Sequence, residues 1–119
     1  MRHLEPKKVV DIRRRNYLQL HEAIQDLPGI RPSYQELPEG VCPVAMPIFV
    51  DEPNRWLQAR PGALPWWQGY HRHCSWDGFP EAIKLKDHTL ILPIHQHLDE
   101  ERIQYIGEKV KEAALKRPR

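Results

Sequence analysis

The chain has 119 residues, enough for one domain with a modest hydrophobic core. Hydrophobic residues make up 40% and charged residues 29%, a balance that favours a folded domain over a disordered chain. The 18 basic and 16 acidic residues leave a net charge of +2, so composition gives no argument for a nucleic-acid or membrane partner.

The lack of an apparent targeting signal and the small number of cysteines favour a reduced, cytoplasmic setting. No apolar run approaches the roughly 20 residues that cross a bilayer, and the N-terminus lacks the apolar stretch of a secretory signal. Cys42 and Cys74 are too few to form a disulfide scaffold in a domain of this size.

The first predicted element is a long helix over about residues 6–27. Tyr17, Leu20 and Ile24 recur at helical spacing, and Pro28-Gly29 is a typical helix stop. The basic run Arg13–Arg15 falls inside this helix. We expect it on a solvated face, with a phosphate-binding patch as the alternative.

The middle of the chain holds most of its 12 prolines and reads as short elements joined by turns. A strand is predicted over 41–50, and its two prolines favour an edge strand or a bulge. A short helix follows over 53–60, with Asp51 or nearby polar residues as its cap. Further strands are predicted over 68–74 and 88–92.

A terminal helix is predicted over about residues 99–115. Asp99 is a suitable N-cap, and the apolar stripe comprises Ile103, Ile106, Val110 and Ala114. Gly107 would allow this helix a close approach to the sheet. Together the elements predict a single α+β domain over 1–119, with a small antiparallel sheet and helices against one face.

Seven histidines raise the question of a metal site. The pairs His71/His73 and His95/His97 have the i, i+2 spacing that points side chains the same way on a strand, and Cys42 could complete a zinc site. The spacing matches no zinc-finger pattern, which favours histidines with no metal role. Trp66 and Trp67 are predicted either to cap the core or to wall a sugar or nucleotide pocket.

Several segments together resemble the C-terminal part of the DegT/DnrJ/StrS aminotransferases, which use pyridoxal phosphate (PLP) to aminate nucleotide-linked keto-sugars. The resemblance runs through 13–17, 27–30 and 42–48. It is strongest over 85–98, where residues 92–98 match the family's Leu-Pro-x-His-Gln-x-Leu. It implies the small domain of a fold-type I aminotransferase: an antiparallel sheet packed against a long N-terminal and a C-terminal helix.

The resemblance also implies what this chain lacks. In the family, the Schiff-base lysine, the acid that pairs with the pyridine nitrogen and the phosphate-binding residues belong to the large domain. We therefore expect no catalytic residue, no cofactor-binding residue and no metal ligand here, and no transamination by the chain alone.

Substrate contacts are implied for residues beside the last strand. By resemblance, His95 and Gln96 would face the substrate, with Trp67, Tyr70 and His71 nearby. His95 could donate a hydrogen bond to a sugar hydroxyl or a phosphate. Residues 60–67 depart from the family's usual loop, which weakens any contact carried over from it.

Two other functions stay open at this point. The chain could be a free-standing interaction or ligand-binding module on the same fold, or a small zinc-binding domain. The expected partner is a large domain or a second copy of the chain, because a sheet without its usual neighbour leaves an apolar surface.

Overall fold

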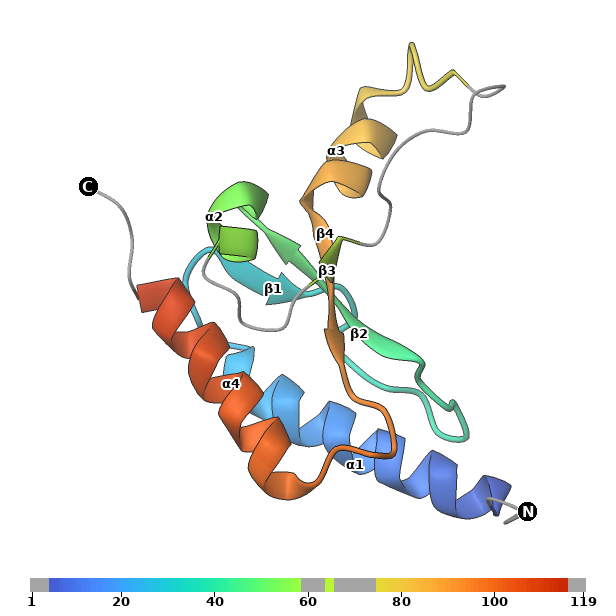
Figure 1. Cartoon of the computed structure of the whole chain (residues 1–119). Coiled ribbons are helices and arrows are strands. Elements are labelled where there is room, and N and C mark those ends of the chain that lie inside the picture. The colour runs from blue at the N-terminus through green and yellow to red at the C-terminus, as the bar shows by residue number, and fades with distance from the viewer. Residues whose placement is uncertain (1–4, 59–63, 66–74, 116–119) are drawn as a thin grey trace.

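The structure, a computed structural model, describes residues 5–58, 64–65 and 75–115 (Figure 1). In chain order the elements are α1 (Pro6–Ile24), β1 (Ile30–Pro32), β2 (Ala45–Val50), α2 (Pro53–Gln58), β3 (Leu64–Pro65), α3 (Pro80–His88), β4 (Thr89–Pro93) and α4 (Glu100–Leu115). The strands form one antiparallel sheet in the order β1-β2-β4-β3. The predicted α+β class with a small antiparallel sheet is confirmed.

The two long helices form where the sequence indicates. Pro6 occupies the first turn of α1, where its missing N–H is not needed. At α4 the predicted N-cap is present: Asp99 Oδ1 accepts a hydrogen bond from the backbone N–H of Arg102 at 2.9 Å. The helices lie side by side, and α1 ends at Ile24, inside the predicted range.

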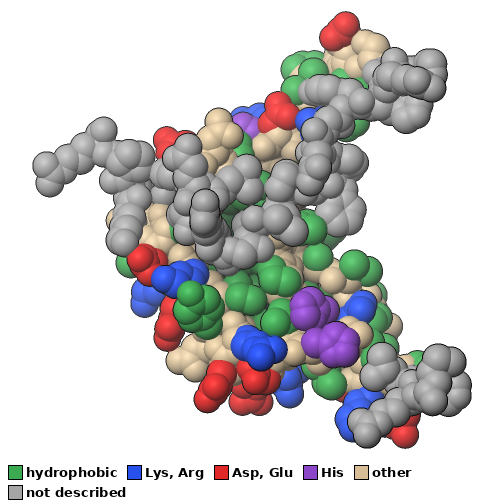
Figure 2. All heavy atoms as spheres, in the orientation of Figure 1, with side chains coloured by type: hydrophobic (Ala, Val, Ile, Leu, Met, Phe, Trp, Pro, Cys, Tyr) green, Lys and Arg blue, Asp and Glu red, His purple; other side chains and the backbone are tan. Residues whose placement is uncertain are grey.

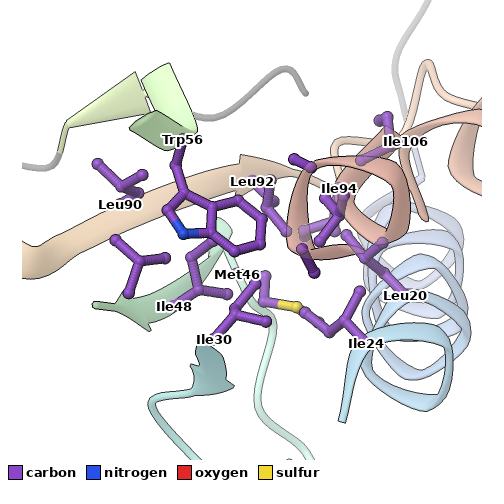
Figure 3. Packing of buried hydrophobic residues seen from close by; sticks show 14 of the residues in the cluster. Leu20, Ile24, Ile30, Met46, Ile48, Trp56, Leu90, Leu92, Ile94 and Ile106 are labelled. Atoms are coloured by element: carbon purple, nitrogen blue, oxygen red, sulfur yellow. The ribbon is translucent and has the colours of Figure 1, made fainter. Parts of the chain in front are cut away.

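One face of the sheet carries the core. Burial alternates along β2, so that Met46, Ile48 and Val50 point inward. Leu90 and Leu92 of β4 lie beside them, and side chains of α1 and α4 close the cluster (Figure 3). The helical contribution comprises Tyr17, Leu20, Ile24, Ile103, Ile106, Val110, Ala113 and Ala114. All four predicted stripe residues of the terminal helix are therefore buried.

The edge position predicted for the proline-containing strand is wrong. Only Ala45–Val50 is extended, and this strand lies between β1 and β4. The interior position tolerates Pro47 because β1 ends beside it. The backbone N–H of Ser33 donates to the Pro47 carbonyl at 3.0 Å, but Pro47 has no N–H to return the bond. The β1–β2 ladder therefore stops at the pair Pro32–Ile48.

Other differences are local. The sequence predicted neither β1 nor α3, and His88 ends α3 rather than starting β4. The strand expected over 68–74 lies outside the described residues. Gly107 approaches α1 instead of the sheet: a Cβ at this position would lie 3.2 Å from Ala23 Cβ. Small residues therefore set the distance between the two long helices.

A tight approach at Gly29 gives the first prediction. Gly29 has φ +77, and an added Cβ would lie 2.7 Å from Asp51 Oδ2. That carboxylate accepts hydrogen bonds from the backbone N–H of Glu52 at 2.8 Å and from Trp56 Nε1 at 3.2 Å. We expect Gly29→Ala to lower the free energy of unfolding by about 2–4 kcal/mol, because the left-handed conformation and the displaced carboxylate both contribute.

Gly40→Ala is the matched control for this variant. Gly40 has φ +81, but nothing lies within 4 Å of its added Cβ. Gly40→Ala should therefore lower the free energy of unfolding by about 1–2 kcal/mol, the cost of the left-handed conformation alone. Urea denaturation of both variants measures the difference, and equal losses would show that the Asp51 contact contributes nothing.

Candidate ligand-binding site

The candidate site lies on the loop that joins β4 to α4, and a buried asparagine of α1 holds this loop in place. Asn16 is fully buried. Its Nδ2 amide lies 3.3 Å from the carbonyl oxygen of Ile94, 3.1 Å from that of His95 and 3.1 Å from that of Leu98. One side chain thus fixes the backbone on both sides of His95 and Gln96.

Arg13 ties the same loop to the segment before β2. Its Nε donates to Gln96 Oε1 at 2.9 Å, and its Nη1 lies 3.5 Å from the Pro43 carbonyl oxygen. The next residue, Arg14, donates from Nη1 to the carbonyl oxygens of Pro38 and Val41 at 2.8 and 2.7 Å. Arg15 is exposed, and its Nη2 donates to Asn16 Oδ1 at 3.2 Å. The arginine run therefore lies on a partly exposed face of α1, and its guanidinium groups also bind protein acceptors.

The two implied substrate residues of the loop adopt defined hydrogen-bonding states. His95 is exposed, and its Nδ1 accepts the backbone N–H of His97 at 3.3 Å. The His95 and His97 rings lie 5.9 Å apart between centroids. Because Nδ1 accepts, the neutral His95 ring carries its proton on Nε2. Gln96 is half-buried, and its carbonyl oxygen is the atom bound by Arg13.

The structure does not describe the other residues implied to contact the substrate. Trp67, Tyr70 and His71 lie outside the described residues, as does Trp66. Of the two described tryptophans, Trp56 is completely buried in the core, where it packs among Ile48 and Leu90 (Figure 3). Trp56 is thus a core residue and not a pocket wall.

A groove of about 590 Å³ lies between α1, the 33–44 segment, β2 and the residues Leu85 and Thr89. Its walls are mostly apolar, and several of its side chains are well exposed: Val44 at 75%, Tyr34 at 64% and Leu85 at 55%. Pro43, whose carbonyl Arg13 contacts, also lines it. Figure 2 shows histidine, basic and hydrophobic side chains close together on one face of the molecule.

Tyr17 lines the groove from α1 and gives a pH prediction. Burial raises the pKa of its phenol above the ordinary 10.0, and the neighbouring Tyr34 raises it further. A raised folded-state pKa means that the stabilisation is complete below pH 10 and is lost as pH rises through the folded-state value. We expect unfolding midpoints in urea to fall between pH 9.5 and about 11 more steeply than in Tyr17→Phe. Parallel slopes would contradict this origin.

The described residues do not fit PLP or a metal ion. Among them, Lys86 is the one buried lysine, and its Nζ lies 3.3 Å from Asp87 Oδ1. The other described lysines lie on exposed or half-exposed helix surface. Within 5–58, 64–65 and 75–115, no three histidine, cysteine or acidic residues gather closely enough to hold a metal. Of the predicted zinc ligands, His71 and His73 lie outside these ranges. None of the described helices could span a membrane.

Comparison with known proteins gives the fold. No family model matches the sequence, and no curated protein matches it. Among solved structures, the chain is similar to the aminotransferase TlmJ from Streptoalloteichus hindustanus, with 20% identity and a TM-score of 0.69 over 90% of this chain and 32% of that one. It is also similar to Helicobacter pylori PseC, an aminotransferase involved in pseudaminic acid biosynthesis, with 16% identity and a TM-score of 0.69 over 89% and 33%.

These similarities are low in identity and define the fold alone. The chain has the fold of one part of two aminotransferases and spans about a third of their length.

Proposed function

We propose that this chain is the small-domain part of a PLP-dependent nucleotide-sugar aminotransferase of the cytoplasm, and that it does not transaminate by itself. The observation that carries this proposal is the fold match over nine-tenths of the chain to a third of two aminotransferases. The sequence resemblance to the DegT/DnrJ/StrS family supports the nucleotide-sugar substrate, because its best-matched motif, residues 92–98, covers the loop at the candidate site.

In this proposal the chain contributes substrate contacts, and the cofactor belongs to a large-domain partner. His95 and Gln96 lie on the loop fixed by Asn16, so their backbone is held before a ligand arrives. The groove lined by Tyr34, Val44 and Leu85 is the proposed contact surface for the large domain. PLP, when bound by that domain, would supply the amino-transfer chemistry.

A free-standing binding module is the second candidate, and the exposed apolar groove is the observation that favours it. In that case a second copy of the chain is the proposed occupant of the groove. Sedimentation at several protein concentrations separates the two. A monomer throughout favours a surface that awaits a large domain, whereas a dimer abolished by Val44→Asp would favour self-association.

The proposal is tested with PLP itself. The purified chain is incubated with PLP, reduced with borohydride and analysed by intact-mass and peptide mass spectrometry. We expect only scattered, substoichiometric lysine adducts, because the described lysines are exposed or, like Lys86, ion-paired. Lys86→Arg and Lys84→Arg serve as a matched pair. A one-to-one adduct at a single lysine would overturn the view that the cofactor lies elsewhere.

A further inference from the structure

The groove beside α1 carries one charge within a mostly apolar lining. Among the described residues that line it, Glu36 is the one charged side chain. The polar groups that accompany it are the hydroxyls of Tyr17, Ser33, Tyr34 and Thr89. Glu36 is exposed, and its carboxylate makes no hydrogen bond or ion pair with any described residue. The described lining therefore presents a negative charge surrounded by apolar surface.

The basic side chains nearest to this wall are bound to its backbone. Arg14 Nη1 donates to the carbonyl oxygens of Pro38 and Val41 at 2.8 and 2.7 Å, and both residues line the groove. Arg13 Nη1 lies 3.5 Å from the carbonyl oxygen of Pro43, a third lining residue. These contacts fix the wall to α1 before a partner arrives, which lowers the ordering cost of binding.

Two tyrosine rings favour the same sign of charge. Tyr17 lines the groove from α1, and Tyr34 lines it from the 33–44 segment. The faces of phenol rings attract ammonium and guanidinium groups that lie within about 6 Å of the ring centre. Apolar surroundings also strengthen the attraction between a carboxylate and a cation, because less water screens it. The groove therefore matches an apolar ligand that carries one positive charge.

From this complementarity we infer that the groove binds a short apolar segment of a partner protein, and that a lysine or arginine of this segment pairs with Glu36. The inference rests on the proposed function for its source, the large domain. The chain spans about a third of two aminotransferases, so most of such a protein lies outside it. Clefts of about 300–1,000 Å³ bury compact ligands, so a groove of about 590 Å³ accommodates a few side chains.

The test is an NMR titration of the isotope-labelled full chain with two matched peptides at constant ionic strength. One is acetyl-Ser-Leu-Lys-Leu-Ser-amide, and the other has glutamine in place of lysine. We expect saturable shifts of the methyl signals of Val44 and Leu85, which are exposed in the groove. The lysine peptide should bind about three- to tenfold more tightly, the combined effect of an exposed ion pair and a cation–π contact.

Variants make the result specific. Glu36→Gln removes the charge but keeps the size of the side chain, so it should bind the two peptides equally. Glu39→Gln is the matched control, because Glu39 is exposed on the same segment but is not among the described lining residues. It should keep the preference for lysine. Val44→Ser removes apolar wall without adding charge and should weaken both peptides severalfold.

A third probe, 4-phenylbutylamine, separates a protein segment from a free amine. It carries the same ammonium group on an apolar body without a peptide backbone. We expect it to bind more weakly than the lysine peptide. Tighter binding of the amine would identify a small molecule as the ligand and overturn the partner segment. A dimer in sedimentation that the lysine peptide dissociates would also overturn it, because a second copy of the chain would then occupy the groove.

Two further results would overturn the inference: equal affinity of the wild type for both peptides, or a preference for lysine that persists in Glu36→Gln. Neither depends on the cofactor experiment, which reads a covalent lysine adduct by mass. A one-to-one PLP adduct together with a preference that depends on Glu36 would remove the proposed function and leave the groove chemistry in place. Scattered adducts without any preference would remove the groove chemistry alone.

Discussion

Asn16→Asp should be among the most destabilising single substitutions in this chain, with an expected loss of about 3–5 kcal/mol at pH 7. The change keeps the size and shape of the side chain but replaces its donor by a second acceptor. The new carboxylate oxygen would face the carbonyl oxygens of Ile94, His95 and Leu98 in a fully buried position. Repulsion and the burial of a charge act together there. The Arg15 guanidinium, whose Nη2 donates to Asn16 Oδ1 at 3.2 Å, offsets only part of this cost.

The pH dependence of this variant separates charge from shape. Below the raised pKa expected for the buried Asp, its carboxyl group is protonated and regains one O–H donor. The stability gap to wild type should therefore narrow between pH 7 and pH 4. Asn16→Leu, which removes the donor without adding charge, should lose about 1–3 kcal/mol, with little change in the gap over that range.

Asn54→Asp is the control, because Asn54 is exposed at the first turn of α2 and should change stability by less than about 0.5 kcal/mol. Urea denaturation at the two pH values measures all three variants. If Asn16→Asp is as stable as Asn54→Asp at pH 7, the three carbonyl contacts do not hold the loop.

Hydrophobic spacing made the two long helices and the inner face of β2 predictable. Residues such as Leu20, Ile24 and Val110 face the core because a surface helix buries one apolar stripe. The spacing of apolar residues in the sequence shows where that stripe lies. The short elements were not predictable in the same way. β1 has three residues and exists because β2 pairs with it, which is a long-range contact with no local signal.

The residues that hold the candidate loop in place were not predicted from the sequence, for a different reason. The sequence singled out His95 and Gln96, but not Asn16 and Arg13, which hold their loop from 79 and 83 residues away. One signal was present: Asn16 sits four and eight residues before Leu20 and Ile24, as a polar residue on an apolar stripe. A polar side chain at such a position must find partners in the interior, and its donors indicate what it holds.

The second large effect is expected at Trp56. Trp56→Ala should lower the free energy of unfolding by about 3–5 kcal/mol, because the indole is completely buried against the inner face of the sheet (Figure 3). Its Nε1 also donates to Asp51 Oδ1 at 3.2 Å, so the ring joins α2 to the end of β2. Trp56→Phe keeps most of the apolar contact but loses this hydrogen bond. Its free energy of unfolding should therefore fall by about 1–2 kcal/mol.

A ligand-pocket wall, the alternative role that the sequence raised for Trp66 and Trp67, would give a different result at Trp56. A pocket wall contributes little to folding, so its removal would leave the urea midpoint nearly unchanged while weakening the ligand. Trp56→Ala should do the opposite. We expect a large fall in the urea midpoint of Trp56→Ala, because the indole is completely buried among core residues such as Ile48 and Leu90. A Trp56→Ala chain with an unchanged urea midpoint would contradict the core role of the indole.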